Sequence, residues 1–576
     1  MPEEKKLTGY PSIDKPWLKY YSEKAKNASL PKCTIYEYIR DCNNNRMENS
    51  AINYFGKKYT YQQLFSSIEI TVKAFTASGV KTGDVVSLCM LSMPKTVYSI
   101  YALNRLGAVC NIIEPRTNAD LIKERIKSAN STVLIVVDIF LNKIINIANE
   151  TSLERVVVVP LSNSMPYFTK VAFSLTKGRE ISDIPKENIY LSWQKFIELG
   201  ENFSVNETTY QKNMPVAIIY TGGTTGISKG AVLSNDCLTA MVVETYFAAP
   251  RLFTGKSFLE IMPPFIAYGL VYGFLIPFCA GLENKLIPVF EPKNFAKLVI
   301  KQRPNHVIGV PSFFESLANS KKLNNCRIDF LTSMIAGGDK MLINTEEHIN
   351  KVFKEHGCNY QITKGYGMTE MGSAATFTIS DECNIYGSVG IPLIFTTVKI
   401  VNPETYEELK YGETGEICMT GPTMMLGYYK NDSETKKVIR EHKDGNKWIH
   451  SGDIGYMTED GVIFIVDRMK RMIIRPDGHN VWPSQIESVI ASHPLVLDCA
   501  VVGLKSKESE NGKIPTAFVV VKEGVNATQE LINDIDKFSK RHLPERDTAM
   551  AYQFCEKLPL TLVGKVDYLS LEKQNL

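Results

Sequence analysis

Short runs of β-branched and other apolar residues recur between helical patterns in the first third of this chain, and they constrain the fold more than any other feature. The runs cover residues 84–90, 109–113, 132–137 and 155–159, with helical patterns at 61–78 and 93–106. Apolar residues at consecutive positions are typical of strands buried on both faces. Their alternation with helices predicts parallel βαβ units, so we expect an α/β fold.

The chain is long enough for several domains, since 576 residues exceed what one core usually supports. Residues 161–213 are polar and weakly periodic, which favours a surface connection between two subdomains. After Gly412, alternating runs separated by Gly-Asp and Asp-Gly turns predict antiparallel strands. From Met472 onward the chain has its own β and α patterns. We predict a large N-terminal domain (1–469), with doubly wound α/β subdomains plus a β-rich subdomain, and a small mobile α+β lid domain (470–576) hinged at Lys470.

Charge and cysteine usage exclude several classes of function. The net charge is only +3 and no long block of like charges occurs, so we expect no nucleic-acid partner. The 12 cysteines include no C-x-x-C pair, which argues against a disulfide framework and a tetrahedral zinc site of that type. The N-terminal segment is charged and lacks an apolar signal region. We therefore expect a cytoplasmic protein.

One stretch, residues 261–281, has no charged residue and is long enough to cross a bilayer. Three prolines and several glycines interrupt it, and no Lys/Arg cluster flanks either end. We therefore expect the wall of a buried pocket and no stable membrane insertion.

A glycine-rich segment follows the buried-strand run at residues 216–220. It contains Thr221, Gly222, Gly223, Thr224, Thr225, Gly226, Ser228, Lys229 and Gly230. Glycines let backbone N–H groups turn toward a phosphate, while hydroxyls and an ammonium group supply further donors. The segment therefore predicts a phosphate-binding loop.

Three other interpretations compete for this segment. A Walker P-loop requires Ser or Thr after its lysine, whereas Gly230 follows Lys229 here. Residues 226–230 match the G-x-S-x-G nucleophile elbow, but the strand ends five residues too early for the serine to lie on a tight strand-to-helix turn. A flexible surface loop with chance Gly and Thr content is the third alternative.

The loop YTGGTTGISKG resembles the phosphate loop of the adenylate-forming superfamily, which includes acyl-CoA synthetases, luciferases and carrier-protein-loading adenylation domains. That loop usually has Pro where this chain has Ser228. The resemblance extends from about Ala51, through TYQQL, ASGVKTGDVVSLCM and ALNRLGAVCNIIEP, to Lys565. It implies an enzyme that uses ATP and Mg²⁺.

The segment GYGMTE, residues 365–370, resembles the second signature of this superfamily. The resemblance implies that Tyr366 packs on adenine, that Gly367 belongs to the nucleotide site, that Thr369 binds the α-phosphate and that Glu370 holds Mg²⁺. These residue types suit that chemistry, because hard cations prefer oxygen ligands. Taken alone, Glu370 would more often be a solvated acid at a helix start.

Two further segments resemble nucleotide-binding parts of the superfamily. Ala336-Gly337-Gly338-Asp339 resembles the segment that lines both the adenine and the acyl pocket, although a tight turn would explain the glycines equally well. SGDIGY, residues 451–456, resembles the motif whose carboxylate, Asp453 here, accepts both ribose hydroxyls. Arg468 would supply a second ribose or phosphate contact.

Near the C-terminus, LPLTLVGKVDY resembles the motif whose lysine, Lys565 here, bridges the substrate carboxylate and the α-phosphate. A lone lysine at such a place is normally a solvated charge. The resemblance places the hinge at Lys470 and the thiol tunnel at Gly478, within RPDGHNVWPSQIE. One extra residue between Arg468 and Gly478, relative to the usual spacing, makes the thiol-side contacts less secure.

The acyl pocket is expected to include Phe265, Ile266, Gly269 and Gly337. Many relatives have His at the position of Ile266, and members that activate amino acids have Asp. Without that acid, a substrate ammonium group would be buried unpaired, at a cost of several kcal/mol. We therefore predict a small-molecule hydrophobic acid, fatty or aromatic.

The resemblance implies attack of a carboxylate on the α-phosphorus of ATP, release of pyrophosphate and transfer of the acyl group to CoA. A ligase that loads the phosphopantetheine thiol of a carrier protein is one alternative, although the chain has no carrier domain of its own. A non-catalytic nucleotide-binding protein is the alternative from another class. Glu370 and Lys565 argue against it, because a binder needs neither.

Overall fold

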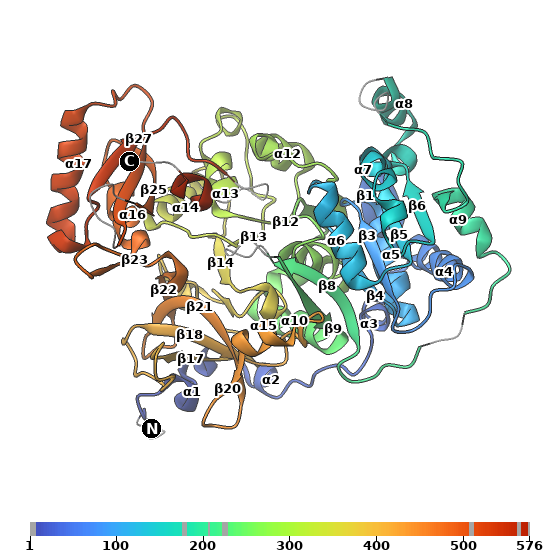
Figure 1. Cartoon of the computed structure of the whole chain (residues 1–576), viewed down its shortest axis with the longest axis horizontal. Coiled ribbons are helices and arrows are strands. Elements are labelled where there is room, and N and C mark those ends of the chain that lie inside the picture. Colours follow the sequence, from blue (N-terminus) through green and yellow to red (C-terminus); the bar gives the residue numbers. More distant parts are fainter. Residues whose placement is uncertain are drawn as a thin grey trace.

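The computed structural model describes residues 7–175, 181–205, 208–221, 228–505, 512–560 and 566–573. Figure 1 shows the N-terminal sheets on one side of the molecule, a β-rich region beside them, and the C-terminal elements at the opposite end. The mixed α/β fold with a large N-terminal part and a small C-terminal part confirms the predicted fold class. The domain boundary at residues 469 and 470 stays a prediction.

The first sheet contains the β-branched runs. Its strands lie in the order β19 (Gly427–Tyr428), β9 (Lys229–Ser234), β8 (Pro215–Thr221), β4 (Val109–Ile112), β3 (Val85–Cys89), β5 (Val133–Val137), β6 (Arg155–Val159) and β7 (Tyr190–Ser192). Strands β8, β4, β3, β5, β6 and β7 run parallel, whereas β9 and β19 are antiparallel additions. The predicted strands are thus buried in a parallel sheet, as their continuous apolar pattern indicates.

The helices between these strands begin and end where the sequence supplies caps. The helices are α4 (Tyr61–Ala77), α5 (Pro94–Leu106), α6 (Ala119–Ala129), α7 (Leu141–Ile145), α8 (Tyr167–Leu175) and α9 (Trp193–Leu199). Thr60 and Gln63 form a reciprocal capping box at the start of α4. α5 has Pro at its first position and ends at Gly107, whose φ of 71° is left-handed.

Residues 161–213 do not connect two subdomains, so that prediction is wrong. They contain α8, β7 and α9, and β7 pairs with β6 in the same sheet that contains β8. The segment therefore leads from the sheet edge back to its middle. Its polar composition reflects surface exposure rather than a boundary, since Gln194, Lys195 and Glu198 of α9 are exposed.

A second sheet packs beside the first. Its order is β16 (Ile391–Pro392), β15 (Thr376–Phe377), β14 (Thr363–Tyr366), β13 (Ser333–Gly337), β12 (His306–Gly309), β10 (Ser257–Glu260), β11 (Glu283–Leu286), β1 (Ser50–Tyr54) and β2 (Lys57–Thr60). Its helices include α10 (Asn235–Ala248), α12 (Phe295–Gln302), α13 (Pro311–Ala318) and α14 (Ile343–Glu355). One hydrophobic cluster joins the two sheets, and Phe278 meets Tyr61 and Tyr101 edge-to-face at centroid distances of 6.5 and 6.1 Å.

The charge-free stretch, residues 261–281, lies inside this core. It follows β10, forms a turn of π-helix at Gly269–Gly273 and then α11 (Ile276–Cys279). Nearly all of its side chains are buried. Within the described ranges, no helix has both the length and the apolar character needed to cross a bilayer.

The β-rich region follows the second sheet. It contains β17 (Thr397–Val401), β18 (Gly415–Thr420), β20 (Ile439–Glu441), β21 (Lys447–Met457) and β22 (Ile463–Arg468), all antiparallel, with α15 (Asp432–Val438) alongside. The alternating runs after Gly412 predicted β18 and β22, whereas β17 lies before them. β19 leaves the region to join the edge of the first sheet, which brings Tyr428 beside β9.

The C-terminal elements form their own core. They are the hairpin of β23 (Ile473–Ile474) and β24 (Asn480–Val481), helix α16 (Pro483–Ala491), strands β25 (Val496–Leu504), β26 (Ile514–Val521) and β27 (Ala551–Phe554), and helices α17 (Gln529–His542) and α18 (Tyr568–Glu572). The run RMIIR pairs with β24 and does not extend the β-rich sheet. Figure 1 shows these elements, in orange and red, next to α13 and α14.

Candidate active site

The phosphate-loop segment connects two antiparallel strands. Thr221 ends β8 and pairs with Lys229 at the start of β9. Gly222, Gly223, Thr224, Thr225 and Gly226 lie outside the described residues. A Walker P-loop and a nucleophile elbow both lead from a strand into a helix, whereas this segment leads into a strand. The topology therefore agrees with rejecting both alternatives.

Side chains from three other elements contact the C-terminal end of this loop, at Ser228 and Lys229. The Lys229 ammonium group forms an ion pair with Glu434 of α15 and lies 5.2 Å from the centroid of the Tyr428 ring. Hydrogen bonds from Lys229 and Lys437 lower the pKa of Glu434 to about 2. Arg125 of α6 donates to the Ser228 hydroxyl at 3.0 Å. The sequence analysis missed Glu434 and Arg125, because isolated charges far from a motif carry no signal.

Glu370 lies in a buried polar pair. It belongs to a short 3-10 turn, Thr369–Met371, and its side chain is only 6% exposed. The Tyr428 hydroxyl donates to Glu370 Oε1 at 2.6 Å, and burial together with this carboxylate raises the pKa of Tyr428. Tyr428 thus lies between Lys229 and Glu370 and links the phosphate loop to the predicted metal ligand. The sequence analysis missed Tyr428 as well.

A carboxylate oxygen is the kind of ligand that Mg²⁺ prefers, and Mg²⁺ is often bound by one or two carboxylates plus substrate phosphates. Glu370 therefore fits a Mg²⁺ ion that a nucleotide brings to the site. Thr369, the neighbouring residue, is half-buried and begins the same turn.

Tyr366, Asp453 and Arg468 converge at the junction of the second sheet and the β-rich region. The Tyr366 hydroxyl donates to Asp453 Oδ2 at 2.7 Å, and Arg468 Nε lies 3.0 Å from Asp453 Oδ1. Asp453 and Arg468 face each other across β21 and β22. Burial raises the pKa of Asp453, while the charge of Arg468 opposes that rise. A buried, oriented carboxylate with spare lone pairs is suited to accept hydroxyl donors.

Two glycines of the nucleotide motifs are required by their surroundings. A Cβ atom on Gly367 would lie 2.1 Å from the Ser373 carbonyl oxygen, and Gly338 has a left-handed φ of 80°. Gly337 ends β13, and Asp339 follows in an exposed turn where it accepts a hydrogen bond from the Lys340 amide at 2.8 Å. The strand end and the turn are both present, so the two interpretations of this segment are compatible.

The predicted acyl-pocket wall contacts the end of β13. Phe265 is buried, whereas Ile266 and Tyr268 are half-buried. A Cβ atom on Gly269 would lie 2.0 Å from the Pro263 carbonyl oxygen, so the chain packs tightly there. The Tyr268 hydroxyl donates to the Ile335 carbonyl oxygen at 3.1 Å and lies 3.5 Å from the position of a Gly337 Cβ atom. Tyr268 is a further pocket candidate, and its place in the charge-free stretch could have indicated it.

The C-terminal elements contact the large domain near the expected hinge. Lys470 is exposed in a 3-10 turn, Met469–Arg471. Arg471 pairs with Glu487 at 2.6 Å and lies 3.9 Å from the centroid of the Tyr568 ring. Lys340 Nζ donates to the Ser484 carbonyl oxygen at 3.0 Å and to the Ser488 hydroxyl at 2.7 Å.

Gly478 and Lys565 are the remaining predicted residues of the C-terminal part. Gly478 lies in the turn between β23 and β24 with a left-handed φ of 79°, and it is exposed. Lys565 falls outside the described residues.

Family models and known proteins give an independent comparison. The family model described as AMP-binding enzyme matches residues 39–429. A second family model, the AMP-binding enzyme C-terminal domain, matches residues 485–565. A long-chain-fatty-acid–CoA ligase of Bacillus subtilis is 27% identical over 567 residues, covering 96% of both chains. A probable 4-coumarate–CoA ligase of Dictyostelium discoideum is 28% identical over 523 residues, covering 89% of this chain and 91% of that one.

Solved structures share the fold. ATP-bound MatB from Rhodopseudomonas palustris aligns with a TM-score of 0.79 at 23% identity, covering 94% of this chain and 99% of that one. A benzoate CoA ligase from Burkholderia xenovorans aligns with a TM-score of 0.78 at 19% identity, covering 94% and 100%. The first family model alone spans more than half of the chain. The protein therefore belongs to the AMP-binding enzyme family, within the adenylate-forming superfamily of ligases that includes the AMP-forming acyl-CoA synthetases.

Proposed function

We propose that this protein converts a hydrophobic carboxylic acid and ATP into an acyl-adenylate and pyrophosphate, and then transfers the acyl group to CoA. One observation carries the proposal: Tyr428 connects Lys229 of the phosphate loop to the buried Glu370. The lysine can neutralise charge on the phosphates of a bound nucleotide, and the carboxylate can bind the metal ion that accompanies them. Asp453, held by Tyr366 and Arg468, would take the ribose at the same site.

The first half-reaction brings two anions together. The acid is already ionised at pH 7, so no general base is needed. Catalysis then rests on positioning and on neutralising charge at the α-phosphate. Thr369 would donate to the α-phosphate, and Lys565 would lie between that phosphate and the substrate carboxylate. A Mg²⁺ ion held by Glu370 would neutralise charge on the phosphates of the bound nucleotide.

The proposed substrate class follows from the wall of the pocket. Residues 261–281 supply no charge, and the half-buried Ile266 and Tyr268 present apolar surface. An α-ammonium group at this wall would be desolvated without a partner, at a cost of several kcal/mol. Fatty and aromatic acids avoid that cost. The curated relatives named for long-chain fatty acids and for 4-coumarate agree with this class.

The second half-reaction would use the C-terminal elements as a lid. Lys470 is exposed between β22 and the C-terminal core, where a change of backbone dihedrals meets little steric resistance. Rotation there would break the Lys340 contacts with α16 and withdraw Lys565. Gly478 would then line the thiol path. All 12 cysteines are free thiols, which supports a reducing compartment, and we place the reaction in the cytoplasm.

Pyrophosphate release measured against a panel of fatty, aryl and amino acids, each with and without CoA, tests this proposal. We expect CoA-dependent turnover to acyl-CoA and AMP with one or more hydrophobic acids. Selective activation of amino acids would contradict the proposed substrate class. A single burst of pyrophosphate that CoA cannot extend would favour a carrier protein as acceptor. The absence of ATP consumption with every acid would favour a non-catalytic nucleotide-binding protein.

A further inference from the structure

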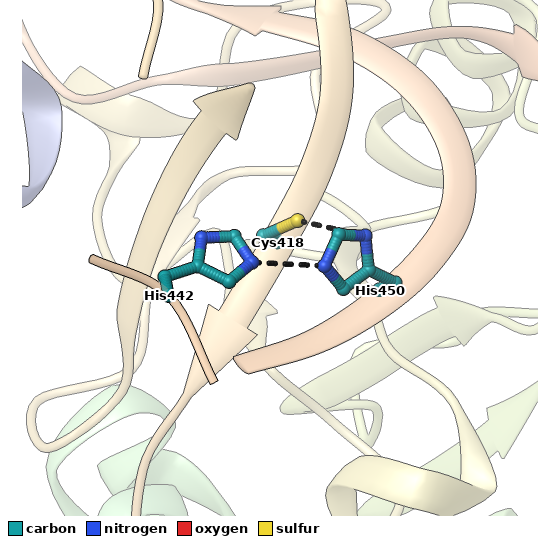
Figure 2. Close-up of side chains that lie close together, drawn as sticks. All are labelled: Cys418, His442 and His450. Carbon is teal, nitrogen blue, oxygen red and sulfur yellow. Dashed lines mark hydrogen bonds between the residues drawn. The ribbon is translucent and has the colours of Figure 1, made fainter. Parts of the chain in front are cut away.

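Three potential metal ligands meet in the β-rich region, separate from the residues of the proposed reaction. Cys418 lies on β18, His450 on β21, and His442 in the turn that joins β20 to β21. One ligand atom from each residue lies within 4.8 Å of the other two. Figure 2 shows the two imidazole rings facing each other, with the Cys418 sulfur beside the His450 ring.

The strand register explains why these side chains converge. Cys418 and His450 are direct partners across β18 and β21, so their side chains point to the same face of the sheet. The backbone hydrogen bond from the His442 amide to the Asn446 carbonyl at 3.1 Å closes the hairpin and returns His442 to that face. Cys418 and His450 are buried, and His442 is half-buried. The strand register and the hairpin therefore place the three side chains on one face of the sheet.

Glu416 orients one of the two imidazoles. Its Oε2 lies 2.7 Å from His450 Nδ1, so His450 donates there and directs the lone pair of Nε2 toward His442. A carboxylate on the far nitrogen of a histidine is a common second partner of histidines that bind metal. His442 Nε2 lies 2.9 Å from His450 Nε2.

Hydrogen bonds leave part of this cluster unsatisfied. The buried Nδ1 of His442 has no hydrogen-bond partner among the described residues, whichever group His442 Nε2 contacts. Cys418 Sγ lies 3.6 Å from His450 Nδ1, a nitrogen that already faces Glu416.

We propose that Cys418, His442 and His450 bind one Zn²⁺ ion, with Glu416 positioning His450. Thiolate and imidazole ligands favour Zn²⁺ over Mg²⁺, so this site differs in kind from one built on Glu370. Tetrahedral zinc, with its usual bond lengths, places two nitrogens about 3.4 Å apart and sulfur about 3.6 Å from nitrogen. The two rings therefore need to separate by only about 0.5 Å relative to the 2.9 Å contact. Solvent would supply the fourth ligand on the half-exposed side of His442.

Binding requires the thiol proton to leave. The Cys418 sulfur–hydrogen bond breaks, a sulfur–zinc bond forms, and the proton passes to solvent.

The site has a direct link to the proposed ribose carboxylate. Glu416 Oε1 accepts a hydrogen bond from the Gly452 amide at 3.0 Å, while its other oxygen faces His450. Gly452 precedes Asp453 on β21. A metal ion that fixes His450 would thus also fix the part of β21 that presents Asp453. The zinc site itself stands on its own ligands and does not depend on the proposed function.

Cobalt titration of the untagged, chelator-treated protein tests the proposal. We expect one equivalent of Co²⁺ to bind with a thiolate-to-cobalt charge-transfer band and the intense visible bands of tetrahedral cobalt, and Zn²⁺ to displace it. Cys418→Ser removes the charge-transfer band, and His442→Gln weakens zinc binding at least tenfold. Cys326→Ser and His348→Gln, at a half-buried thiol and an exposed imidazole elsewhere, leave the titration unchanged.

A second measurement avoids the risk that a variant fails to fold. Zinc-edge X-ray absorption of the wild-type protein with one equivalent of Zn²⁺ is expected to show one sulfur and two imidazole nitrogens. A shell of nitrogen and oxygen alone would overturn the proposal. Charge transfer that persists in Cys418→Ser, or a wild-type protein that binds no Co²⁺ or Zn²⁺ at all, would overturn it equally.

Discussion

The two sides of the proposed active site are built differently. On the nucleotide side, charged and polar groups from separate elements pair with each other, as Lys229 does with Glu434 and Asp453 does with Arg468. On the acyl side, residues 261–281 are free of charge and pack tightly, with glycine where Pro263 approaches the chain. Charge chemistry depends on a few obligatory groups, whereas pocket shape depends on the packing of many. The difference predicts that substitutions on the two sides will fail in different ways.

The largest effect is expected at Lys565. Lys565→Ala removes the charge proposed to neutralise the α-phosphate and the carboxylate, and the loss of one such group typically costs about 10² to 10³ in rate. Adenylation should fall by that factor, whereas thioester formation from supplied acyl-adenylate should persist. Lys557→Ala, at an exposed lysine of the same region, is the matched control. Adenylation within a few fold of wild type would remove Lys565 from the mechanism.

A smaller loss is expected when the link between phosphate loop and metal ligand is cut. Tyr428→Phe deletes the hydroxyl that donates to Glu370, a charge-assisted bond worth about 1.5 to 3 kcal/mol. The Mg²⁺ concentration needed for half-maximal adenylation should change by roughly tenfold or more, a factor that follows from this energy. Tyr429→Phe is the control, because the Tyr429 hydroxyl lies 3.5 Å from the Ala129 carbonyl oxygen. Equal Mg²⁺ titrations for the two variants would contradict the proposed role of Tyr428.

On the acyl side, Ile266→Asp tests the inference about charge. A carboxylate at the half-buried wall should lower kcat/KM for the preferred hydrophobic acid by about tenfold or more, because the charge must be desolvated when that acid binds. The KM for ATP should stay unchanged, since the nucleotide contacts lie elsewhere. Ile266→Leu preserves the apolar wall and should retain activity. A parallel loss of ATP affinity in the Asp variant would show that the two sides are not separable.

The last prediction concerns stability rather than activity, through its pH dependence beside the acyl wall. Glu244 is buried near Tyr272, and burial raises its pKa from 4.5 to about 8. The folded protein therefore retains a proton that the unfolded chain loses above pH 4.5, so stability falls as the pH rises through this window.

The slope from this group should be at most about 1.4 kcal/mol per pH unit, and it should level off above pH 8. Glu244→Gln removes the titration. Denaturant unfolding from pH 5 to pH 9 should show the variant gaining on the wild type as the pH increases. A constant difference between the two proteins across this range would show that Glu244 is not buried as a neutral acid.

Much of the fold was predictable, because local patterns carry it. The buried runs became parallel strands, the helical patterns at 61–78 and 93–106 became α4 and α5, and the alternating pattern after Gly412 became antiparallel strands. The prediction failed for residues 161–213, because a short edge strand such as β7 has too weak a pattern to reveal that it pairs with β6. Strand order is decided by contacts distant in sequence, which periodicity does not encode.

The sequence by itself determined the motifs whose chemistry needs particular residue types, such as Thr369 with Glu370 and the Gly-Asp of Asp453. Only the tertiary structure decided which groups these residues meet. Tyr428 reaches Glu370 because β19 leaves the β-rich region for the edge of the first sheet, and Cys418 meets His450 because β18 and β21 pair in that register. Tyr428 and Cys418 lie outside the recognised motifs. Pairing between strands that are distant in the sequence creates both contacts. A motif identifies the reactive residue, whereas the tertiary structure determines which neighbouring residues orient it.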